Sequence, residues 1–93
     1  MIVGVFEVQL HIPSSTSLKE KRMVIKSIKD KMAKKFNISV AELDYHDKWQ
    51  RSLLGFAIIA ADKGFVEEVL QKMFQLLDAD LRFEIIQHSF IYK

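Results

Sequence analysis

The sequence predicts an α+β domain whose elements follow the order strand, helix, strand, strand, helix, strand. Two kinds of periodicity carry this prediction: apolar residues alternate in the strand segments and recur every three or four residues in the helical ones. The third observation is the length of 93 residues, of which 49% are apolar and 28% charged. Such a chain suffices for one core and leaves little room for a second. We therefore expect a single domain over residues 1–93.

The first strand is expected over residues 2–12. Apolar side chains at every second position, from Ile2 to Ile12, share one face, which we assign to the core. The other face carries Val3, Val5, Glu7, Gln9 and His11. Pro13 and the polar residues 14–16 then end the strand.

The first helix is expected to begin after Ser17 and to run to about residue 36. Ser17 and Glu20 have the spacing of a capping box, in which the two side chains bond free amides of the first turn. Asn37 suits the left-handed residue that closes a helix. The apolar stripe of this helix is predicted to be Leu18, Ile25, Ile28, Met32 and Phe36.

The third strand is apolar on both faces, which is typical of a central strand. Its phase stays open: either Leu53, Ala57 and Ile59 or Leu54, Phe56 and Ile58 lie away from the helices. Asp62 is expected to cap the second helix. The remaining elements are expected at residues 38–44 (strand), 52–61 (strand), 62–79 (helix) and 83–92 (strand). The residues of the second helix expected to face inward are Phe65, Val66, Val69, Leu70, Met73, Leu76 and Leu77.

Right-handed connections turn this element order into a ferredoxin-like βαββαβ sandwich. Its four-stranded antiparallel sheet has both helices on one face, so the other face has no helical cover. Either phase of the third strand exposes apolar side chains there, which indicates a homodimer through the open sheet face. The alternative is a few scattered exposed apolar residues, which are normal on protein surfaces.

Charge is distributed unevenly along the chain. The net charge is only +2, yet the stretch from Lys19 to Lys35 contains eight basic residues and two acidic ones. A helix of this composition creates a positive potential that attracts phosphate or an acidic partner. The alternative is that these lysines only keep the surface soluble.

Two segments have the residue types that RNA recognition uses. Lys19, Arg22, Lys26 and Lys29 share one helical face, as a row of phosphate contacts requires. Residues 49–51, W-Q-R, combine an aromatic ring for stacking with polar groups for bases and phosphates. The alternative for this loop is that Trp49 folds back onto the sheet. An RNA-recognition motif has the same topology, but only Gly55 and Phe56 match its third-strand pattern.

Several function classes lack their motifs. The chain has no phosphate-binding Gly-rich loop, nucleophile elbow or zinc-type His pair, so we expect no enzyme activity and no cofactor. With no Cys, and with His11, His46 and His88 on different elements, we expect no metal site. No apolar run is long enough to cross a membrane, and no signal peptide is apparent. A cytoplasmic protein without membrane contact is therefore expected.

The motifs of the chain resemble those of the bacterial YlxP-like family. The resemblance runs end to end and rests on S-L-K-E-K-R at residues 17–22, F-N-I-S-V-A-E at 36–42, Asp47, W-Q-R at 49–51, and Gly55. It implies a small ferredoxin-like protein of unassigned biochemical function. Genes of this family often neighbour those for translation initiation factor two and ribosome-binding factor A, which implies a link to translation or ribosome assembly. The resemblance implies no catalytic residue and no cofactor.

The leading hypothesis is a non-enzymatic module that binds RNA or the ribosome. The alternative is a protein-interaction or dimerisation module that uses the open sheet face and binds no nucleic acid. A third possibility is a hydrolytic activity with His46 or Asp47 as base. The residues expected to contact RNA are Lys19, Lys21, Arg22, Lys26, Lys29, Trp49, Gln50 and Arg51.

Overall fold

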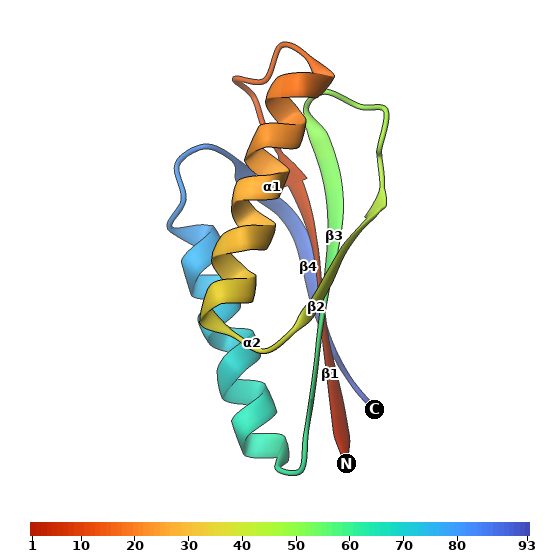
Figure 1. The fold of residues 1–93 in the computed structure, drawn as a ribbon, viewed down its shortest axis with the longest axis vertical. Helices are drawn as coiled ribbons and strands as arrows, with labels where there is room; N and C mark the ends of the chain where they lie inside the picture. Colours follow the sequence, from red (N-terminus) through yellow and green to blue (C-terminus); the bar gives the residue numbers. More distant parts are fainter.

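A computed structural model describes residues 1–93 and confirms the ferredoxin-like arrangement (Figure 1). The sheet is antiparallel throughout, with the strand order β2-β3-β1-β4. Both helices cover the same face of it. No helix is both long and apolar enough to cross a membrane. The elements are β1 (Ile2–His11), α1 (Leu18–Lys35), β2 (Ser39–Asp44), β3 (Arg51–Ala60), α2 (Lys63–Asp78) and β4 (Glu84–Tyr92).

The register of the sheet settles the phase of β3. Phe6 of β1 lies opposite Phe56 of β3 and Phe90 of β4. The rings of Phe6 and Phe56 stack 5.7 Å apart between the sheet and the helices. Directly opposite residues share a face, so Leu54, Phe56 and Ile58 face the helices and are buried. Leu53, Ala57 and Ile59 therefore lie on the open face.

Both helices bury most of the stripes that their periodicity predicts. Phe36 and Leu76 are half-buried against the core, whereas Leu18 is half-buried outside it. Ile25, Ile28 and Met32 of α1 are buried, as are five residues of α2. The prediction for Phe65 is wrong, because its side chain is 51% exposed. It lies about 100° around the helix axis from Val66, at the margin of the buried stripe.

The helix ends differ in how well the sequence predicts them. Ser17 caps α1 as expected, since its Oγ accepts a hydrogen bond from the Glu20 amide. The Asp62 carboxylate likewise caps α2. The prediction for Asn37 is wrong: α1 ends at Phe36 in extended backbone, with φ −132° and ψ 146°. Phe36 packs against the core, so the chain enters β2 without a left-handed turn.

One end of the molecule holds the structural elements that carry the polar motifs. The turn at residues 12–17 and the loop at residues 45–50 lie together at the end opposite the two termini (Figure 1). A backbone hydrogen bond of 2.8 Å from the Ile12 amide to the Gln50 carbonyl joins the two segments. The fold thereby brings the start of α1 next to the β2–β3 loop.

Candidate nucleic-acid interface

The exposed side of α1 carries a dense set of cations. Lys19, Arg22 and Lys26 are exposed, and Lys29 is half-buried on the same flank of the helix. The capping of α1 fixes the start of this row: besides the Ser17 bond, the Glu20 carboxylate accepts hydrogen bonds from the amide and hydroxyl of Thr16, at 2.6 and 2.8 Å. These bonds lower the pKa of Glu20.

Most of these cations have no acidic partner. Only Lys26 forms a surface ion pair, 2.7 Å from Asp30, with both side chains more than half exposed. The pair lowers the pKa of Asp30 and raises that of Lys26, in each case through their hydrogen bond. An ion pair so open to water contributes little to stability. A phosphate can therefore replace Asp30 as the partner of Lys26 at little cost. Ion pairs of α1 residues at the surface are otherwise absent, and the free cations are Lys19, Arg22, Lys29, Lys31, Lys34 and Lys35.

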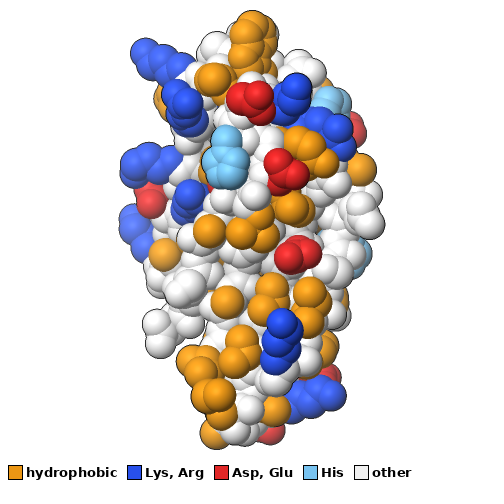
Figure 2. Space-filling model, turned by 90° about the vertical axis from the view of Figure 1, so that its right-hand side faces the viewer, with side chains coloured by type: hydrophobic (Ala, Val, Ile, Leu, Met, Phe, Trp, Pro, Cys, Tyr) orange, Lys and Arg blue, Asp and Glu red, His pale blue; other side chains and the backbone are white.

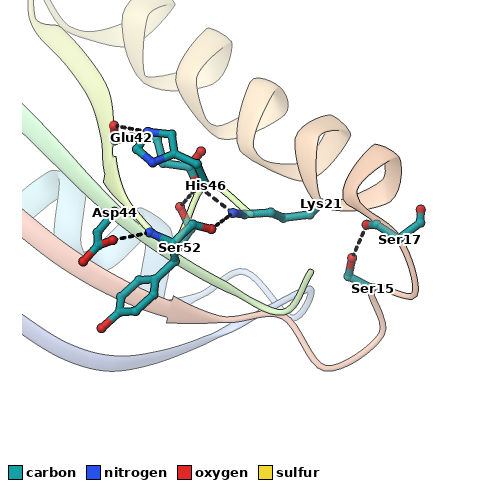
Figure 3. Close-up of polar contacts among 8 residues, drawn as sticks. Ser15, Ser17, Lys21, Glu42, Asp44, His46 and Ser52 are labelled. Carbon is teal, nitrogen blue, oxygen red and sulfur yellow. Dashed lines mark hydrogen bonds and ion pairs between the residues drawn. The ribbon is translucent and has the colours of Figure 1, made fainter. Parts of the chain in front are cut away.

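Lys21 lies inside the protein. Its side chain is 1% exposed and reaches from α1 to β2, where Nζ lies 2.8 Å from Oε2 of Glu42 (Figure 3). The same ammonium donates to the carbonyl of Tyr45 at 2.5 Å, and the Ser52 hydroxyl donates to Glu42 Oε2 at 2.6 Å. A side chain in this position cannot touch RNA, so Lys21 does not belong to the exposed row.

The Glu42 carboxylate is the acceptor at the centre of this cluster. Burial by itself raises its pKa, but the hydrogen bonds from Lys21 and Ser52 outweigh that effect. The pKa of Glu42 is therefore lowered, and the group is ionised opposite the lysine. A buried lysine would be costly without such a partner.

The loop at residues 45–50 is held against α1 and the 12–17 turn. Tyr45 has a left-handed backbone with φ 64°, its amide donates to Asp44 Oδ1, and its carbonyl accepts from Lys21. The guanidinium of Arg51 lies 4.6 Å from the centre of the Tyr45 ring. Gln50 Nε2 donates to the carbonyls of Pro13 and Ser15, at 3.1 Å each. The loop is thus tied at both of its ends.

Trp49 points outward from this anchored loop. Its side chain is 53% exposed and is not among the hydrophobic residues packed against the core. The alternative that it folds back onto the sheet is therefore wrong. Of residues 49–51, which were predicted to contact RNA, Trp49 is open to a ligand, Arg51 at the start of β3 covers the Tyr45 ring, and the Gln50 amide hydrogens are engaged within the protein.

The sequence does not predict that Lys21, Glu42 and Ser52 come together in one cluster. A clue existed for Lys21, because it lies four residues before Ile25 and hence on the buried stripe. Glu42 and Ser52 gave no such clue, since their contact with α1 depends on how the helix lies over the sheet. His46 joins them from the loop, with Nε2 3.1 Å from the Glu42 carbonyl.

The other histidines lie apart from each other. His11 is opposite Glu84, with Nδ1 3.6 Å from its carboxylate. His88 is opposite Val8, on the helix-facing side, and its ring lies 4.4 Å from that of Phe74. No group of three or more His, Asp or Glu side chains comes together in a way that could hold a metal ion.

Two comparisons with known proteins agree on the family. The model of a family described as "Protein of unknown function (DUF503)" matches residues 3–90. The uncharacterized protein YlxP of Bacillus subtilis (strain 168) is 36% identical over 78 residues, which cover 84% of this chain and 85% of that protein. The expected resemblance is confirmed, and the chain belongs to the DUF503 family, whose biochemical function is not assigned.

Proposed function

We propose that this chain is a non-enzymatic module that binds RNA, in the setting of the ribosome or its assembly. The observation that carries the proposal is the excess of cations on α1, where Lys26 is the one surface cation with an acidic partner and six others have none. The two lysines of α2 with nearby carboxylates make the contrast: Lys63 lies 3.9 Å from Glu67, and Lys72 lies 3.1 Å from Glu68. Only α1 therefore offers a concentrated, uncompensated positive surface to a polyanion.

The exposed Trp49 supplies the second element of the proposed surface. Stacking on an aromatic ring is the usual way in which proteins hold unpaired bases. The contacts of Lys21 with Tyr45 and of Gln50 with Pro13 and Ser15 fix the loop beside the first turns of α1. The proposed interface combines a phosphate-binding row (Lys19, Arg22, Lys26 and Lys29) with one stacking ring, Trp49.

The burial of the polar cluster of Lys21, Glu42 and Ser52 favours a non-enzymatic role. Lys21 is 1% exposed and Ser52 is fully buried, so a substrate has no access to the nucleophilic groups of the cluster. The gene neighbourhood implied by the family resemblance supports a setting in translation or ribosome assembly.

Binding to ribosomal subunits and to total RNA tests the proposal. The Arg22→Ala/Lys26→Ala variant should bind at least about tenfold more weakly than wild type, because two phosphate contacts are lost. The matched control is Lys63→Ala/Lys72→Ala, which removes the same charge from α2 and should bind like wild type. Equal affinity of all three proteins would contradict the proposal.

The fluorescence of Trp49 gives an independent readout, because it is the single tryptophan of the chain. We expect RNA to quench it and Trp49→Ala to weaken binding. If neither RNA nor subunits bind at low salt, the alternative of a protein-interaction module is favoured.

A further inference from the structure

We infer that the open face of the sheet binds a second copy of this chain, face against face. The register defines the apolar part of this face: Val3 lies opposite Ile59, and Val5 lies between Ala57 and Ile91. Ile59 is the most exposed of these side chains, at 61%. Figure 2 shows hydrophobic side chains gathered over the centre and the lower part of this face. Leu43 extends the apolar area across β2, against Gly55.

The chemistry of this face favours a protein surface over nucleic acid. Phe6, Phe56 and Phe90 occupy the helix-facing register, so the strands offer no aromatic ring for base stacking on the open face. Many Lys and Arg side chains lie along the left margin in Figure 2, and few lie within the apolar area. An apolar area on the surface of a folded domain is typical of a protein interface.

The arrangement of charges makes the face complementary to itself. Lys93 continues β4 beside Val3, with two backbone hydrogen bonds of 2.8 Å between them. Glu7 lies on the same face, two residues beyond Val5 along β1. A two-fold axis that crosses the strands at Val5 places the Val3 row of one copy over the Glu7 row of the other. Each Glu7 carboxylate then lies within reach of the Lys93 ammonium of the second copy, so the two can form an ion pair across the interface.

The size of the face is sufficient for a specific dimer. With an axis at Val5, about seven residues of each long strand and most of the shorter β2 overlap the other copy, a footprint of roughly 400 Å² at about 3.3 Å per residue and about 4.8 Å between strands. Protruding side chains make the accessible area larger, near the roughly 500 Å² per partner at the lower limit of specific interfaces. Since both helices cover the opposite face of the sheet, such a dimer leaves the cations of α1 exposed.

Sedimentation equilibrium between about 5 and 500 µM tests this inference. We expect a concentration-dependent dimer for wild type. Ile59→Glu should raise the dissociation constant at least about 100-fold, because it places one unpaired charge in each half of the interface. Leu81→Glu is the matched control, since Leu81 is fully exposed in the turn before β4 and should leave the constant unchanged.

Charge reversal tests the geometry independently of the apolar contact. Glu7→Lys and Lys93→Glu should each weaken the dimer about tenfold, and the double variant should restore it to within a few-fold of wild type. Circular dichroism verifies that each variant is folded. A wild-type monomer at 500 µM, an unaffected Ile59→Glu dimer, or a double variant weaker than both single ones would overturn the inference.

Discussion

The ammonium of Lys21 lies 2.8 Å from the carboxylate of Glu42, with the lysine 1% exposed and the glutamate 16%. This ion pair joins α1 to β2, and Figure 3 shows that it lies directly beside the β2–β3 loop. Because the same ammonium also binds the Tyr45 carbonyl, it couples the position of the loop to that of the helix. The pair is therefore the structural basis of the proposed composite surface.

Lys21→Met should lower the free energy of unfolding by about 3 kcal/mol, because it leaves the Glu42 carboxylate without its charged partner. Lys26→Met is the matched control: it removes a lysine from the same helix and breaks the exposed pair with Asp30. The control should change stability by less than about 0.5 kcal/mol. Urea denaturation measures both, and equal effects would show that the buried pair has no special role.

The Glu42 carboxylate should make folding sensitive to acid. Its pKa is lowered in the folded protein from the ordinary value of 4.5. A lowered folded pKa contributes stability above pH 4.5, which is lost as the pH falls through the folded pKa. Wild type should therefore lose more stability than Glu42→Gln between about pH 5 and pH 3. Parallel stability curves for the two proteins would contradict this origin of acid sensitivity.

Gln50→Leu should detach the loop from the turn before α1. The side chain of Gln50 holds the carbonyls of Pro13 and Ser15. Its replacement removes two hydrogen bonds, which we expect to lower stability by about 1–2 kcal/mol. Hydrogen exchange should become faster at the amides of residues 12–17 and 45–50 and stay unchanged in α2. Unchanged exchange in both segments would show that these bonds do not hold the loop.

Much of the fold was predictable because it depends on local pattern. Alternation in β1 identifies its buried face from Phe6 to Leu10, and the capping residues Ser17 and Asp62 locate both helix starts. The phase of β3 was not predictable, because both of its faces are apolar. Only pairing with β1 resolves it, and that pairing is a contact between distant segments.

The candidate site was predictable in part. The spacing of Lys19, Arg22 and Lys26 follows from helix geometry and needs no tertiary information. The role of Lys21 depends on a partner in another strand. Tyr45 breaks a local rule, because a bulky residue rarely adopts positive φ. Its amide bonds the adjacent Asp44, but the bond from Lys21 to its carbonyl forms only in the folded protein.

The salt dependence of RNA binding tests the central claim most directly, because each phosphate contact made by a cation adds to the slope of log affinity against log salt. We predict that Arg22→Ala/Lys26→Ala flattens that slope by about 1.4 for single-stranded RNA, from two lost contacts of about 0.7 each. The Lys63→Ala/Lys72→Ala control should keep the wild-type slope. An unchanged slope in the α1 variant, or equal flattening in the control, would contradict the assignment of α1 as the RNA-binding surface.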